Sequence, residues 1–219
     1  MGRKKDIGAK VALSLLTLAL FVTPVFSQKQ PDSVEEETTP VLPPRSVEKQ
    51  YNQAILDTLY VELKEAETST QATEISKKIM RMKFFAGGDT ISAIMKRVSE
   101  IMSQYDPRMP EELRANNDNV ANALLQRIID MNPKYAESYN HRSVLNLRKQ
   151  DYDSAINDIA MTLSLDNRHY DAMLGLARVY HAQHNDYRAM IVIMKVLDIY
   201  PLLIPARDLK FEIENTNNI

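Results

Sequence analysis

Three alanines, Ala121, Ala155 and Ala189, stand 34 residues apart in this chain of 219 residues. Apolar residues recur at the same spacing, in the sets Leu125, Ile159 and Ile193, then Ile129, Leu163 and Leu197, then Met131, Leu165 and Ile199. A period of 34 with small residues in fixed register is typical of helix-turn-helix solenoids, in which each hairpin stacks on its neighbours to bury its apolar face. The pattern predicts an all-α fold with a curved surface for holding another chain, rather than a catalytic pocket.

The composition agrees with helices and narrows the chemistry. The chain has only 5 glycines, no tryptophan and no cysteine. Without cysteine there is no disulfide, no thiolate metal site and no cysteine nucleophile. The formal charge is −2, and beyond the first 27 residues the chain carries 23 basic and 28 acidic side chains. This mildly acidic balance argues against nucleic acid as a partner, because a basic face supplies most of the affinity for phosphates.

The first 27 residues have the pattern of a cleavable signal peptide. Met1–Lys10 is basic, Val11–Val22 is apolar, and Pro24 precedes the expected cut between Ser27 and Gln28. The alternative is an uncleaved membrane anchor, but the apolar run is shorter than the ~20 residues that a spanning helix needs. We therefore expect a periplasmic or, alternatively, secreted protein with no membrane span after cleavage.

The next two segments differ from the repeats. Residues 28–45 are rich in proline and acidic side chains, which predicts an extended linker that acts as a spacer or as a plain solvated tail. Residues 46–86 carry apolar residues about four apart and predict an N-terminal pair of helices, ended by Gly87-Gly88. This pair can extend the solenoid as a further repeat-like hairpin. Asp89 is expected to cap a third helix, Thr90 to Gln104.

The region from Ala136 resembles the tetratricopeptide repeat (TPR). Tyr139 is aromatic in the first turn, Ser143 and Ala155 are small where the two helices cross, and Asp151-Tyr152 marks the turn. The resemblance implies a TPR-like domain over residues 87–219, as found in short bacterial exported TPR proteins. Its three repeats would span about 91–133, 136–167 and 170–201, with a capping helix over 205–214. Residues 107–117 form an insertion before the second helix of the first repeat, which is expected to start at Asp118.

The resemblance also implies which residues face the concave groove. These are Asn140, Val144, Leu147, Arg148, Asp171, Leu174, Arg178 and His181. A mixed apolar and polar lining suits an extended peptide or a partner helix, although the convex side or a loop could bind instead. Some family members clamp a C-terminal carboxylate with basic side chains, but the corresponding positions here, Met95, Ser99, His141, Asp171 and Gly175, offer no Lys or Arg. A clamp of that kind is not expected.

Arg142 stands where the family usually has a leucine against the neighbouring helix. A buried guanidinium needs a carboxylate partner, and Asp158 on the second helix of the same repeat is the candidate. The alternative is that Arg142 presents its charge to a ligand.

Other candidate sites are weak. His181 and His184 have an H-x-x-H spacing, with His141 and His169 elsewhere, but there is no H-E-x-x-H context, so we expect solvated or groove-lining histidines and no metal or cofactor. No serine lies in a G-x-S-x-G elbow, and no catalytic residues are predicted. The sequence thus predicts a non-catalytic scaffold that binds a protein or peptide. One alternative is a self-assembling module that forms a homodimer through its N-terminal end. The other is an accessory subunit of an envelope complex.

Overall fold

The computed structural model describes the backbone of residues 45–216 and the side chains of residues 52–215. Over this range the chain folds into helices with no strand: α1 (Arg45–Glu65), α2 (Ser69–Phe85), α3 (Asp89–Ser103), α4 (Glu111–Met131), α5 (Ala136–Arg148), α6 (Tyr152–Leu165), α7 (Tyr170–Ala182), α8 (Asp186–Ile199) and α9 (Ile204–Thr216). All of them belong to one compact unit. The expected signal peptide and residues 28–44 of the expected linker lie outside the described residues. Between residues 45 and 216, no helix is both long and apolar enough to cross a membrane.

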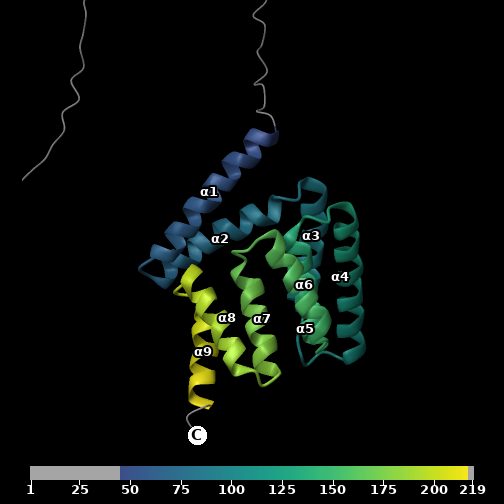
Figure 1. Cartoon of the computed structure of the whole chain (residues 1–219). Helices are drawn as coiled ribbons and strands as arrows, with labels where there is room; N and C mark the ends of the chain where they lie inside the picture. Colours follow the sequence, from purple (N-terminus) through teal and green to yellow (C-terminus); the bar gives the residue numbers. More distant parts are fainter. Residues whose placement is uncertain (1–44, 217–219) are drawn as a thin grey trace, which may run out of the picture. The chain divides into compact units, whose positions relative to one another are not determined.

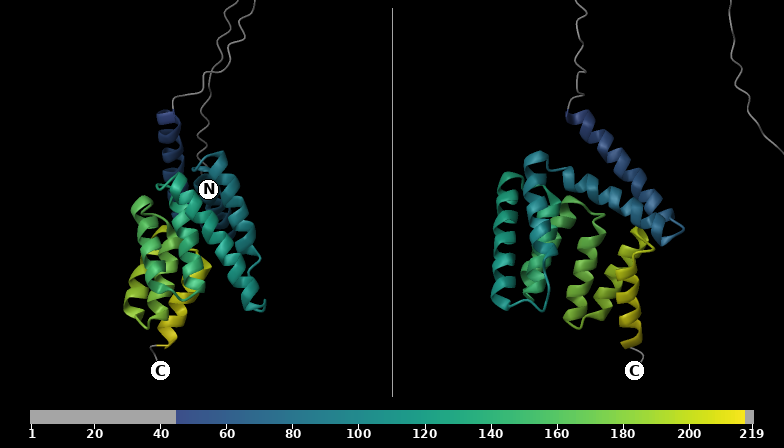
Figure 2. Two further views of the ribbon diagram at one scale, coloured as in Figure 1. Left: turned by 90° about the vertical axis from the view of Figure 1, so that its right-hand side faces the viewer. Right: turned by 180° about the vertical axis from the view of Figure 1, so that it is seen from behind.

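Three stacked helical hairpins form the repeats, so the predicted all-α solenoid is confirmed. The hairpins α3–α4, α5–α6 and α7–α8 lie next to one another in chain order, and α9 packs on the last of them (Figures 1 and 2). Ala121, Ala155 and Ala189 are completely buried where the two helices of a hairpin approach each other. Their small side chains allow that approach, which explains why alanine recurs every 34 residues.

Local hydrogen bonds begin the later helices at the expected places. The side chain of Asp151 accepts from the backbone N–H of Ser154, and Asn185 does the same for Arg188. The turns before them each place one residue in the left-handed region, Gln150 at φ 57° and His184 at φ 56°. These two residues are again 34 apart, so the turn repeats along with the helices.

Helix α4 begins at Glu111, seven residues before the expected start at Asp118. Most of the expected 107–117 insertion is therefore additional helix. Pro110 fits just before a helix because its φ is already set, and Glu111 and Glu112 favour the positive end of the helix dipole. The apolar periodicity did not reveal these turns because Leu113, their one large apolar residue, is exposed.

The α1–α2 hairpin packs across the repeats and is not one more stacked repeat. Helix α2 contacts α3, whereas α1 reaches α8 at the other end of the array. Apolar side chains of the hairpin share one continuous core with the third repeat and α9, namely Leu59, Leu63, Ile75 and Ile79 with Leu174, Ile193, Val196 and Ile213. An ion pair between Lys64 and Asp198, with N and O 2.8 Å apart, also joins α1 to α8. The hairpin is thus an integral part of the folded unit.

Two glycines should respond oppositely to alanine. A Cβ added at Gly87 would lie 2.5 Å from Cγ2 of Ile91, a stiff β-branched side chain, so Gly87→Ala should destabilise the protein by about 1–3 kcal/mol. At Gly175, inside α7, the nearest atoms are 3.6 Å and 3.8 Å away, so Gly175→Ala should stabilise by about 0.5–1 kcal/mol. Urea unfolding of both variants measures the difference, and equal midpoints would contradict it.

Candidate functional site

A cleft of about 590 Å³ opens between the C-terminal half of α2 and the first helices of the repeats. Its lining comes from α2, from α3, and from the N-terminal turns of α5 and α7, together with the residue just before α7. The lining residues are Met80, Arg81, Lys83, Phe84, Phe85, Ser99, Glu137, Asn140, His141, His169, Tyr170 and Asp171. The cleft therefore lies on the side of the repeats that the sequence assigns to the groove, with α2 as an additional wall.

The α2 wall is apolar and open to solvent. Met80 is 53% exposed and Phe85 is 55% exposed, while Phe84 is half-buried and meets Phe85 edge to face, with ring centroids 5.3 Å apart. The guanidinium of Arg81 lies 6.0 Å from the centroid of the Phe85 ring, at the exposed edge of the wall. Large apolar side chains exposed beside a cleft are a common feature of binding surfaces.

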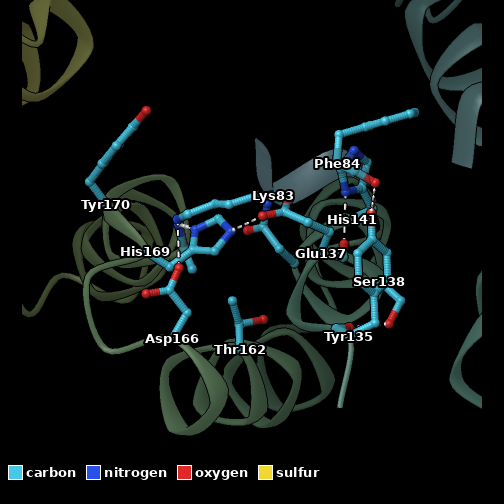
Figure 3. Close-up of polar contacts among 12 residues, drawn as sticks. Lys83, Phe84, Tyr135, Glu137, Ser138, His141, Thr162, Asp166, His169 and Tyr170 are labelled. Atoms are coloured by element: carbon cyan, nitrogen blue, oxygen red, sulfur yellow. Dashed lines mark hydrogen bonds and ion pairs between the residues drawn. The ribbon is translucent and has the colours of Figure 1, made fainter. Parts of the chain in front are cut away.

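On the opposite side of the cleft, two hydrogen bonds of His169 connect the start of α7 to Glu137. Nδ1 of His169 accepts a hydrogen bond from the backbone N–H of Ala172 and so caps α7. The ring proton is therefore on Nε2, which donates to Oε1 of Glu137 at 3.0 Å (Figure 3). Burial by itself raises the pKa of Glu137, but the hydrogen bond from His169 and the nearby positive charges outweigh it and lower the pKa to about 2. Glu137 is therefore ionised and already has a partner inside the protein.

An ion pair between Lys83 and Asp166 connects α2 to the repeats. Nζ of Lys83 lies 2.6 Å from a carboxylate oxygen of Asp166, and the two side chains are 12% and 23% exposed (Figure 3). Two tyrosines also tie α2 to the repeats, because the Tyr135 hydroxyl donates to the carbonyl of Phe84 and the Tyr170 hydroxyl pairs with Ser76. A third, Tyr60 on α1, donates its hydroxyl to the carbonyl of Arg168. Burial raises the pKa of all three tyrosines, which keeps them protonated.

Asp171 differs from Glu137 although both lie in the first turn of their helices. Its carboxylate accepts no hydrogen bond and forms no ion pair with the side chains of residues 52–215. Burial, opposed by the nearby His169, raises the pKa of Asp171, and the charge of Glu137 raises it further. The cleft thus contains an acceptor whose hydrogen-bonding capacity is not used within the described part of the chain.

The structure distributes the predicted groove residues among different environments. Asn140 and Asp171 line the cleft, Val144 and Arg178 are exposed, and Leu147 is half-buried against the core between α6 and α7. Leu174 is only 5% exposed, since it belongs to the core shared with α1 and α2. It is therefore not accessible to a partner in this structure.

The two remaining groove residues have partners within the chain. Arg148 pairs with Asp118 at 3.2 Å, donates to the carbonyl of Met102 and lies over the ring of Tyr105. Nδ1 of His181 lies 2.6 Å from Asp186, and this hydrogen bond raises the pKa of the imidazole. His184 is not part of this contact, and among the described residues no group of three His, Asp or Glu side chains could hold a metal ion.

The predicted pair of Arg142 and Asp158 is confirmed. Nε and Nη2 of Arg142 donate to the carboxylate of Asp158 at 2.6–3.1 Å, and Nη1 donates to Gln126 on α4 of the preceding repeat. Asp158 also accepts from the side-chain amide of Asn146 and is only 4% exposed. Arg142 is thus a structural residue that joins two repeats.

The contribution of α2 to the cleft was not predicted from the sequence. Met80, Lys83 and Phe85 lie outside the repeat register, and more than 50 residues separate them from the side chains they face on α5 and α7. The one signal in the sequence was Phe84-Phe85, two aromatic side chains next to basic residues at the end of an amphipathic helix.

The chain is similar to known proteins with helical repeats. No family model matches the chain. A TPR repeat-containing protein of Rhizobium etli is 30% identical over 146 residues, which span 67% of this chain and 66% of that relative. Among solved structures, YrrB, described as a TPR protein with an unusual peptide-binding site, gives a TM-score of 0.42 at 17% identity, covering 75% of this chain and 86% of the other. With its 34-residue period and stacked hairpins, the chain belongs to the tetratricopeptide-repeat family.

Proposed function

We propose that this protein is a non-catalytic adaptor that binds a segment of another protein in the cleft between α2 and the repeats. The observation that carries the proposal is the cleft itself, which combines exposed Met80 and Phe85 on one wall with Asn140 and Asp171 on the other. An apolar wall facing a few polar groups supplies affinity from burial and orientation from hydrogen bonds. A TPR fold is suited to this task because its repeats present successive helices to one extended ligand.

Binding in the cleft uses only part of the groove that the sequence predicts. The α1–α2 hairpin covers Leu174, and internal contacts occupy Arg148 and His181. A partner would therefore contact α2 together with the first turns of α5 and α7. This restricts the ligand to a short segment rather than a helix lying along all the repeats.

Photo-crosslinking tests this function. A benzophenone amino acid replaces Phe85 in the cleft or, as the matched control, Phe211, the same side chain exposed on α9 away from the cleft. We expect a discrete adduct with a different protein from position 85 in the native cell envelope and none of the same mass from position 211. Identical adducts from both positions, or none from position 85, would contradict binding in the cleft.

We also propose that the protein works in the periplasm after cleavage between Ser27 and Gln28. Support comes from the basic and apolar pattern of residues 1–22. N-terminal sequencing of the protein from cells should begin at Gln28. An intact N-terminus in the membrane fraction would instead indicate an anchor.

Self-assembly through the N-terminal helices has less support. The large apolar side chains of the α1–α2 hairpin, including Leu59, Leu63 and Ile79, are buried against the third repeat of the same chain. A dimer would need other surfaces of this hairpin. The homodimer stays an alternative that light scattering can test.

A further inference from the structure

We propose that the cleft selects segments in which a lysine or arginine adjoins a large apolar residue, with Asp171 as the partner of the cation. The inference rests on the proposed function and specifies its ligand. The apolar residue would lie against Met80 and Phe85, and the cationic head would reach the carboxylate of Asp171 on the facing helix.

Two carboxylates in the cleft occupy the same repeat position. Glu137 and Asp171 are 34 residues apart, and each occupies the first turn of the first helix of its repeat. Glu137 accepts a hydrogen bond from Nε2 of His169, whereas Asp171 accepts none within residues 52–215. The side chain of His169 also accepts a hydrogen bond from the backbone N–H of Ala172, so His169 and not Asp171 caps α7. Asp171 lies at the positive end of the α7 dipole, but no side chain within residues 52–215 pairs with it.

The basic side chains around the cleft do not neutralise Asp171. Lys83 forms an ion pair with Asp166 at 2.6 Å, and Arg81 lies beside the Phe85 ring on the exposed rim of the cleft. His169 uses both ring nitrogens elsewhere, Nδ1 with the backbone N–H of Ala172 and Nε2 with Glu137, so it does not bond Asp171. Lys83 and His141 lower the pKa of Asp171 from a distance, but no basic side chain of residues 52–215 forms an ion pair with its carboxylate, whereas Glu137 is paired with His169. The unmet electrostatic requirement of the cleft is therefore a cation.

Burial makes that requirement stronger. A carboxylate taken partly out of water favours its neutral form unless a positive charge compensates, and the pKa of Asp171 is raised for this reason. A lysine ammonium or arginine guanidinium would supply both the charge and the donors. Its aliphatic stem can cover Met80 while the head reaches the carboxylate. An acidic segment or a free C-terminal carboxylate would instead face Asp171 and be repelled.

The experiment is a selection of capped random nonapeptides, with neutral ends, on the full chain purified from the cell envelope. We expect Lys or Arg next to Leu, Met or an aromatic residue among the selected peptides. Replacing that Lys or Arg with Gln in the tightest peptide should raise its Kd by about 10- to 30-fold, as expected for a partly buried charge pair. Enrichment without a cation, or enrichment of acidic peptides, would overturn the inference but leave the proposed function intact. If no peptide binds, both fail.

Variants separate the role of Asp171 from general electrostatics. Asp171→Asn should reduce the affinity for the selected cationic peptide by the same factor and leave its Gln analogue unaffected. The control is Asp153→Asn, an exposed aspartate in the first turn of α6, which should change neither Kd. Asp171→Lys should reverse the preference toward a Glu analogue of the peptide. Equal losses in Asp153→Asn and Asp171→Asn would assign the effect to net charge and overturn the site.

Discussion

Replacing Arg142 with methionine is expected to lower the free energy of unfolding by about 3–5 kcal/mol, the cost of leaving a buried charge without its partner. Asp158 is 4% exposed and accepts its hydrogen bonds from Arg142 and Asn146. After the substitution only the amide of Asn146 would still donate to it. The contact from Arg142 to Gln126 would also be lost, which weakens the junction of the first and second repeats.

Two comparisons isolate this effect in urea unfolding followed by circular dichroism. Arg97→Met breaks an exposed pair with Glu100 and should cost no more than about 1 kcal/mol. The double variant Arg142→Met with Asp158→Leu should recover much of the lost stability, because no buried charge is then left unpaired. If Arg142→Met is as mild as Arg97→Met, the pair makes no large contribution to the fold.

Replacing Ile79 with alanine is expected to lower the free energy of unfolding by about 2–5 kcal/mol, through lost burial and the cavity left behind. Ile79 is fully buried on α2, in the core that joins the α1–α2 hairpin to the third repeat. Because the hairpin packs on those repeats, the loss should reach beyond α2. Hydrogen exchange should become faster in α7 and α8 as well.

The neighbouring residue is the matched control. Met80 is the next residue on α2 but is 53% exposed, so Met80→Ala should cost less than about 1 kcal/mol. A large effect of Ile79→Ala confined to α1 and α2, with unchanged exchange in α7 and α8, would mean that the hairpin folds apart from the repeats.

The repeats were predictable from sequence because their determinants are local and periodic. Ala155 and its equivalents identify where helices cross, and Asp151 marks a helix start, since capping depends on residues only three positions away. The pair of Arg142 and Asp158 was predictable for a related reason: 16 residues apart in one hairpin, they are placed by the repeat itself. The start of α4 was not predictable, because its first turns have no buried apolar residues at helical spacing.

The sequence by itself determined that the chain is a helical solenoid and which residues occupy equivalent places in its repeats, because a 34-residue period reports contacts between neighbours in the chain. The tertiary structure alone decided where the α1–α2 hairpin lies. Its packing on α8 and on the third repeat depends on contacts between residues about 100 positions apart, such as Ser76 with Tyr170, which leave no periodic signal. That placement buries Leu174, positions Met80 and Phe85 opposite Asp171, and so creates the cleft.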